Sequence, residues 1–218
     1  LDWWKCGDPK AGKSVSVSEA EWLQLSNKVI AALAIISLSV QHGDKVLLFS
    51  QSLHTLNVFE QFLRLTSWNE LVGVPSRERL SDWVKGRQYL RIDGSTDQRQ
   101  ELIDKFNKNP AIKLMLISTR AGNMGINLQA ANRVIVFDAS WNPVHDLQAI
   151  FRAYRFGQKK SVFVYRLIAS GSMEERIYKR QVTKQTLAAR VVDGQMPDNQ
   201  FSAQEQAELM KFSEGEDG

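Results

Sequence analysis

The sequence contains a single cysteine, Cys6, among 218 residues, which excludes an internal disulfide. A lone thiol is typical of a reducing compartment such as the cytosol or the nucleus. The three histidines are scattered, and one cysteine adds no ligand spacing, so no metal site is predicted. No apolar run reaches the length of a membrane span, and no signal-peptide pattern is present. We therefore expect no membrane partner.

The composition is that of a globular protein, with 43% hydrophobic and 24% charged residues. The length allows one large domain or two small ones, either with a real core. The chain does not begin with Met, and we expect it to be a piece of a longer protein. Residues 1–17 show neither helical nor strand periodicity and are interpreted as a linker.

The charge is unevenly distributed around a net value of +4. Residues 150–190 contain ten Lys or Arg and two Glu, whereas residues 198–218 contain six acidic residues and one Lys. The basic block favours an anionic partner. We interpret residues 193–218 as an acidic C-terminal extension.

The linker contains a phosphate-loop pattern, G-x-x-x-x-G-K-[ST], at residues 7–14. That pattern binds phosphate only when a buried strand precedes it and a helix begins at its lysine. Residues 1–6 are too short and polar for a central strand, and residues 14–18 are a poor helix start. We interpret the match as a chance one.

Between residues 18 and 192, short apolar runs alternate with helical periodicity. We expect strands at 45–50, 89–92, 113–118, 133–137 and 162–167, and helices at 18–42, 53–63, 95–108, 148–158 and 172–191. Ser18 with Glu21, and Ser95 with Gln98, form the spacing of capping boxes. Residues 66–88 lack periodicity and read as an insertion anchored by its tryptophans. The alternation predicts an α/β fold with a parallel, doubly wound sheet.

Four polar loops follow the predicted strands, at residues 50–52, 93–96, 118–122 and 138–143. In a parallel sheet these loops meet at the carboxyl edge, where ligands bind. Their hydroxyls and glycines suit contacts to a phosphate backbone, although the same residues also serve as helix caps and turns. Trp141 either contacts a nucleic-acid strand or packs against the sheet.

A polar stripe marks residues 148–158, in which Gln148, Arg152 and Arg155 follow helical spacing. Two guanidiniums in fixed relation suit a polyphosphate, because each binds anionic oxygens bidentately and stays charged. The alternative is a solvated basic helix end. We expect this helix to lie beside the carboxyl edge, with Gly157 as its stop.

The stretches 45–51, 91–96, 117–128, 137–143 and 148–158 occur in the order of helicase motifs IV, IVa, V, Va and VI. They resemble the second RecA-like lobe of superfamily-2 helicases, specifically the Swi/Snf-type chromatin-remodelling ATPases. Within the Rad54-like group the chain is most similar to the branch of ATRX and the androgen-receptor-interacting protein. The resemblance spans about residues 27–192, and the lobe is expected to occupy 18–192 with helices on both faces of its sheet.

The resemblance also implies roles for individual residues. Arg152 and Arg155 match arginine fingers that reach a triphosphate bound on the first lobe. The remaining matches fall into two groups: Gln148, Gly122, Gly125 and Asn127 lie near the nucleotide, and Ser50, Ser95, Thr96, Thr119, Arg120, Trp141 and Asn142 lie along the DNA. Tyr154 and Phe156 stand where many relatives have His and Ile, and Asn123 replaces a common glycine.

By this resemblance the chain is half of a nuclear, ATP-dependent double-stranded-DNA translocase, with ATP and Mg²⁺ bound mainly by an N-terminal lobe. Its expected partners are DNA or chromatin, that first lobe, and transcription-factor or chromatin proteins. The chain alone is expected to be inactive as an ATPase. Two other functions stay open: a non-catalytic nucleic-acid or protein docking platform, and an independent phosphate-loop domain. Only the resemblance selects DNA over RNA.

Overall fold

The structure is a computed structural model that describes residues 26–64, 83–122 and 125–193. Five parallel strands form one sheet in the order β2-β3-β1-β4-β5. Their bounds are β1 Val46–Ser50, β2 Tyr89–Ile92, β3 Leu114–Ser118, β4 Arg133–Val136 and β5 Phe163–Arg166. The predicted parallel, doubly wound sheet is confirmed, and each expected strand lies within about one residue of its predicted position.

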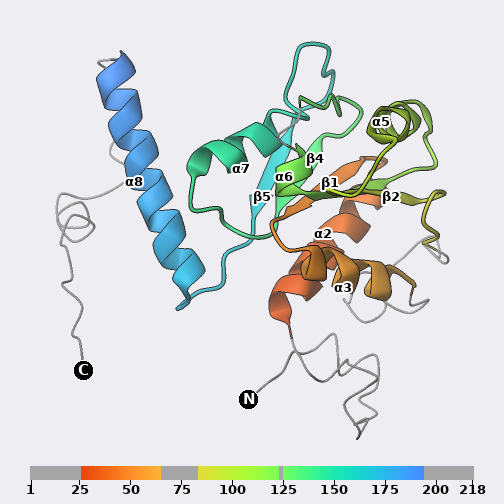
Figure 1. Cartoon of the computed structure of the whole chain (residues 1–218), viewed down its shortest axis with the longest axis horizontal. Helices are drawn as coiled ribbons and strands as arrows, with labels where there is room; N and C mark the ends of the chain where they lie inside the picture. Colours follow the sequence, from red (N-terminus) through yellow and green to blue (C-terminus); the bar gives the residue numbers. More distant parts are fainter. Residues whose placement is uncertain (1–25, 65–82, 123–124, 194–218) are drawn as a thin grey trace, which may run out of the picture.

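Helices cover both faces of the sheet because each central strand is apolar on both sides (Figure 1). In β1, Val46 and Leu48 pack with α2 (Asn27–Gln41) and α3 (Leu53–Arg64). Leu47 and Phe49 face the opposite layer. That layer contains α5 (Arg99–Lys108), α6 (Thr119–Gly122) and α7 (Pro143–Ile150). The two layers thus enclose two hydrophobic clusters separated by the sheet.

The first described helix begins later than the sequence predicts. Ser26 is extended, with φ −143° and ψ 96°, and its side chain accepts a hydrogen bond from the Val29 N–H. The expectation of one uninterrupted helix from residue 18 to residue 42 is therefore wrong, because Ser26, within that span, is extended and α2 begins after it. The Ser18 and Glu21 capping box, the linker and its phosphate-loop pattern lie outside the described residues.

Most of the predicted insertion, residues 65–82, also lies outside the described part of the chain. Its C-terminal end is described, and there Trp83 is 3% exposed and packs into the cluster with α2 and α3. The expectation that this tryptophan anchors the segment is confirmed. Trp68 lies outside the described residues.

The last described helix, α8 (Met173–Asp193), leans away from the sheet in Figure 1. Its first turn is attached to α2, because Glu174 accepts hydrogen bonds from the Lys28 ammonium at 2.6 and 2.7 Å. Two turns later Gln181 donates to the Ser140 carbonyl and to the Asp146 carboxylate, the latter at 2.9 Å. No helix in the described residues is long and apolar enough to cross a membrane.

Candidate functional site

Four polar loops meet at the carboxyl edge of the sheet, as expected for parallel strands. The register pairs Ser50 with Ser118, so the ends of β1 and β3 lie side by side. The loops after β2 and β4 follow at the same edge, because β2 pairs with β3 and β4 pairs with β1. The edge therefore brings the predicted DNA-facing residues together on one side of the molecule.

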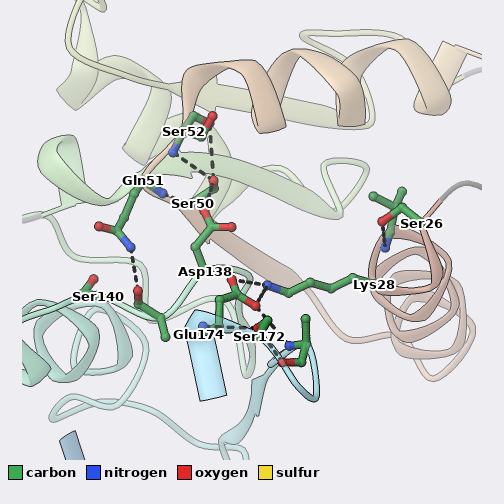
Figure 2. Close-up of polar contacts among 12 residues, drawn as sticks. Ser26, Lys28, Ser50, Gln51, Ser52, Asp138, Ser140, Ser172 and Glu174 are labelled. Carbon is green, nitrogen blue, oxygen red and sulfur yellow. Dashed lines mark hydrogen bonds and ion pairs between the residues drawn. The ribbon is translucent and has the colours of Figure 1, made fainter. Parts of the chain in front are cut away.

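Ser50 is held inside this edge rather than presented from it. It is 1% exposed, and its hydroxyl donates a hydrogen bond to the Asp138 carboxylate. The Gln51 backbone N–H donates to the same carboxylate at 3.0 Å, and its side-chain amide donates to the Ala139 carbonyl at 2.9 Å (Figure 2). Asp138 and Gln51, given no role by the sequence, thus join the loops after β1 and β4.

The loop after β2 is built around the Asp93 carboxylate. Ser95 donates to it from the backbone N–H at 3.1 Å and from the hydroxyl at 2.6 Å, and Arg91 donates at 2.9 Å. The Ser95 hydroxyl is the main cause of a lowered Asp93 pKa, with burial opposing it and the Ser95 N–H and Arg91 adding to it. Ser95 is exposed and Thr96 half-buried.

This arrangement overturns the predicted capping box of Ser95 and Gln98. Helix α5 begins at Arg99, and Gln98, at its N-cap, makes no side-chain capping bond. The Ser95 hydroxyl instead donates to the carboxylate of Asp93, two residues earlier. This hydrogen bond forms a local turn that competes with extension of the helix.

After β3 the chain makes the short helix α6, in which Thr119 is buried and Arg120 exposed. Gly122 lies against Phe49: a β-carbon added at residue 122 would be 2.9 Å from the Phe49 Cε1 atom. Gly125 has φ +67°, a conformation that other residues rarely adopt. Asn123 lies outside the described residues.

After β4, Trp141 is 64% exposed, so its side chain does not pack into the sheet. Asn142 is exposed as well, and its side chain accepts a hydrogen bond from the Val144 N–H at 3.1 Å, which caps α7. A cap does not use all the hydrogen-bonding capacity of an amide. Both residues are therefore accessible at the carboxyl edge.

The predicted helix over residues 148–158 is wrong, because α7 ends at Ile150. The chain then turns tightly: Arg152 N–H bonds the Ala149 carbonyl at 3.2 Å, and Tyr154 N–H bonds the Ile150 carbonyl at 3.1 Å. The Arg152 carbonyl pairs with the Leu128 N–H at 3.0 Å, a contact distant in sequence. Gln148, on the helix, and the two arginines, beyond it, do not form one helical stripe.

Arg152 is 7% exposed, and its Nε atom has no hydrogen-bond partner. No side chain within residues 26–64, 83–122 and 125–184 forms an ion pair with its guanidinium. Burial, and secondarily the charge of Arg155, lowers the Arg152 pKa. An unpaired buried cation is costly, so the arrangement favours an anion supplied from outside the described structure.

Arg155 is exposed, and its Nε donates to the Phe151 carbonyl at 3.0 Å, which leaves its terminal nitrogens available. The side chains around it are unusually apolar for a surface. Phe151 and Tyr154 have ring centroids 6.4 Å apart, and Phe156 is fully exposed. Gly157, with φ +97°, completes the turn.

The arginines do not lie at the carboxyl edge, contrary to expectation. Helix α7 starts at that edge with Pro143 and runs back, so the turn after Ile150 lies beside residues 128–131, just before β4 begins. Eight helical residues separate the two places, about 12 Å. The structure thus separates the arginine loop, residues 151–158, from a carboxyl-edge patch that holds the predicted DNA-facing residues: Ser50, Ser95, Thr96, Thr119, Arg120, Trp141 and Asn142.

Two side-chain amides for which the sequence predicted no role connect the segment 127–131 to its surroundings, one from the arginine loop and one from α5. Gln158 donates to the carbonyls of Gln129 and Ala131, at 3.0 and 2.8 Å. Asn107 donates to the Asn127 carbonyl at 2.9 Å. Asn127 itself has an exposed side chain. No local pattern predicts these bonds, because each joins elements at least 20 residues apart.

Comparison with known proteins gives three consistent results. Residues 27–157 match the family model described as helicase conserved C-terminal domain. The chain is 48% identical over 221 residues to the protein CHROMATIN REMODELING 20 of Arabidopsis thaliana, and 44% identical over 227 residues to the human transcriptional regulator ATRX. These alignments cover 99% and 97% of this chain but only 14% and 8% of the relatives.

Helicase ARIP4 of Xenopus tropicalis is 45% identical over 198 residues, which is 89% of this chain and 14% of that protein. Among solved structures, the C-terminal part of the Fun30 ATPase domain matches with a TM-score of 0.60 and 37% identity. That match covers 75% of this chain and 47% of the other. The expected fold and the expected branch of relatives are both confirmed.

Proposed function

The chain belongs to the helicase C-terminal domain family, and from that premise we propose that it is the second motor lobe of an ATP-dependent double-stranded-DNA translocase that remodels chromatin in the nucleus. The relatives are Swi/Snf-type proteins, and the lobe has their RecA-like fold. The chain covers only a small share of each relative's length. Binding to DNA, to chromatin and to transcription-factor partners is therefore proposed for this chain and does not follow from the comparisons.

The observation that carries the proposal is buried Arg152, whose Nε atom has no hydrogen-bond partner and whose guanidinium forms no ion pair among the described side chains. A fold that holds a cation without a counter-ion gives up stability, and such strain is typical of functional sites. The fork of the guanidinium fits phosphate oxygens, and Arg155 adds a second positive charge three residues later. An anionic phosphate from a neighbouring lobe would satisfy both groups.

ATP, when bound, supplies the phosphoryl group that is transferred to water. In our proposal Arg152 and Arg155 stabilise the negative charge that develops on that group. We also assign Gln148, Gly122, Gly125 and Asn127 to the nucleotide, with Gly122 reaching it from the end of α6 next to the carboxyl edge. The described residues contain no acidic or histidine cluster for a metal, and we assign Mg²⁺ to the first lobe.

The carboxyl-edge patch is proposed to contact the DNA backbone. Ser95, Thr96, Arg120, Trp141 and Asn142 are accessible there, whereas Ser50 and Thr119 are buried and would act through their backbone or after a local rearrangement. Contacts of this kind track phosphate without reading sequence. Binding is then expected to be sequence-tolerant and to weaken steeply with salt.

The proposal is tested with Arg155→Ala in the complete two-lobe protein. We expect DNA-stimulated ATP hydrolysis to fall by at least about 10³-fold, the usual effect of an arginine finger. Arg176→Ala, on the exposed surface of α8, is the matched control and should hydrolyse ATP normally. Unchanged hydrolysis by the Arg155 variant would contradict the proposal.

The exposed rings of the arginine loop favour a second candidate function, a docking platform without catalysis. Phe151, Tyr154 and Phe156 form an aromatic surface of the kind enriched at protein interfaces. The Arg155→Ala measurement separates the two functions, because a platform would bind its partner while hydrolysis is unaffected. Loss of hydrolysis selects the motor lobe.

A further inference from the structure

The last turn of α5 is hydrogen-bonded to the irregular segment that precedes β4. The Asn107 side chain donates from Nδ2 to the Asn127 carbonyl at 2.9 Å, and its Oδ1 accepts from the Ala130 N–H at 3.3 Å. One amide therefore satisfies a carbonyl and an N–H of the same segment, a use for which its donor and acceptor are suited. Leu128 and Ala131 also share a hydrophobic cluster with Ile103 and Phe106 of α5, so the Asn107 amide adds directional hydrogen bonds to an apolar contact.

The arginine loop holds the same segment from the other side. Leu128 donates its N–H to the Arg152 carbonyl at 3.0 Å, and Gln158 donates to the carbonyls of Gln129 and Ala131. Residues 127–131 thus lie between α5 and the arginine loop. The Arg152 backbone is hydrogen-bonded to this segment. Its guanidinium, by contrast, forms no ion pair with a described side chain, and its Nε atom has no hydrogen-bond partner.

We propose that Asn107 is a positioning residue for Arg152, acting through the segment 127–131. The inference rests on the proposed function, in which Arg152 acts on the nucleotide phosphate. Since no counter-charge holds the guanidinium, its place is set by its backbone. A shift of about 1 Å in a catalytic group can reduce a rate about 100-fold. Asn107 can therefore affect the rate of hydrolysis without contacting ATP.

The opposite end of α5 holds the carboxyl-edge patch. Arg99, in the first turn, donates to the Thr96 carbonyl at 2.9 Å and to the Gly94 carbonyl at 3.0 Å. Arg99 and Asn107 are eight residues apart on this helix, about 12 Å along its axis. Helix α5 therefore fixes the loop proposed to contact DNA at one end and the support of Arg152 at the other.

The test is Asn107→Ala in the complete two-lobe protein, with kcat and KM for ATP, DNA affinity and melting temperature all measured. We expect kcat to fall between about tenfold and 100-fold, because the arginine is displaced. KM for ATP and the Kd for DNA should change by less than about twofold, since ground-state contacts remain. Gln100→Ala is the matched control on the same helix, because the exposed Gln100 side chain donates to Asp104 within α5, at 2.9 Å, and to no other group in the described part of the chain.

Asn107→Asp separates positioning from general damage to the fold. The carboxylate keeps an acceptor for the Ala130 N–H but has no donor for the Asn127 carbonyl, so its kcat should lie between those of the wild type and the alanine variant. Normal kcat in Asn107→Ala, while Arg155→Ala still abolishes hydrolysis, would overturn this inference and leave the proposed function intact. Parallel losses of kcat, DNA affinity and melting temperature would overturn it as well. If neither Asn107→Ala nor Arg155→Ala has an effect, the proposed function itself fails.

Discussion

At the scale of single residues, the central feature is a cation kept where it destabilises the fold. Arg152 is buried without a counter-ion among the described residues, and burial lowers its pKa. The sequence identified this residue through its spacing and family resemblance but could not indicate its burial. Burial depends on contacts distant in sequence, and Leu128, whose N–H bonds the Arg152 carbonyl, meets the arginine loop only in the folded chain.

We expect Arg152→Met to fold at least as stably as the wild type. Methionine keeps an unbranched apolar stem and removes the unpaired charge, a change that is often neutral or stabilising at buried positions. A gain of about 1 kcal/mol would raise the melting temperature by about 2–4 °C for a chain of this size. Thermal unfolding checks this, and a fall of several degrees would show that Arg152 has a structural partner.

The Asp93 carboxylate predicts a pH-dependent stability. Its pKa is lowered in the folded state, chiefly by the Ser95 hydroxyl. The resulting stabilisation is therefore complete above the pKa of an unfolded aspartate, about 3.9, and is lost as pH falls through the lower folded value. Asp93→Asn should cost about 1–2 kcal/mol at neutral pH and much less in acid.

Urea unfolding at several pH values measures this difference. Asp97→Asn, at an exposed position of the same loop, serves as the control and should have little effect at any pH. A cost for Asp93→Asn that is the same in acid as at neutral pH would show that the charge of Asp93 does not contribute.

At the scale of helices and strands, the sequence predicted strands better than helix ends. A buried strand is a short apolar run, and β1 and β3 are buried at every residue and apolar at all but the final serine. The position of a helix end depends on which hydrogen-bond partners the polar side chains and backbone groups near it have. Ser95 bonds Asp93 instead of capping α5, and the Arg152 carbonyl bonds Leu128 instead of continuing α7.

The attachment of α8 depends on Gln181, a residue that the sequence did not distinguish. It is 3% exposed and donates to the Ser140 carbonyl and the Asp146 carboxylate. Gln181→Leu leaves both acceptors without this donor and should cost about 1–3 kcal/mol. Gln181→Glu should cost more, because its carboxylate would face Asp146.

Denaturant unfolding of the two Gln181 variants checks this prediction. Lys184→Ala is the control, since Lys184 is exposed on the same helix. Equal stability of all three variants and the wild type would mean that Gln181 does not fasten α8 to the loop before α7.

At the scale of the whole molecule, the predicted α/β alternation was sufficient for the parallel sheet and for the convergence of its loops. It was not sufficient to locate the arginines, which lie at the far end of α7 from those loops. A connecting helix in a parallel sheet runs back from the carboxyl edge, so the separation of the arginines from the loops could have been predicted from the sequence. The contacts of Asn107 and Gln158 could not have been predicted, because they join segments that are distant in the sequence.

The separation supports a division of labour across the lobe. In our proposal the carboxyl-edge patch contacts DNA and the arginine loop contacts the nucleotide, and α5 and the segment 127–131 connect the two. A lobe with this layout can contact DNA with one surface while another completes a nucleotide site on a neighbouring lobe. The proposal therefore needs both lobes for hydrolysis, and this chain alone is expected to show none.

The most direct test compares how the complete two-lobe protein binds ADP with aluminium fluoride, a mimic of the transferred phosphoryl group, and ADP alone. Arg152→Met should lose a preference for the mimic of about 10³-fold or more, because an arginine finger acts mainly on the transition state. Its affinity for ADP should be nearly that of the wild type. A variant that keeps the full preference for the mimic would contradict the assignment of Arg152 to the phosphate.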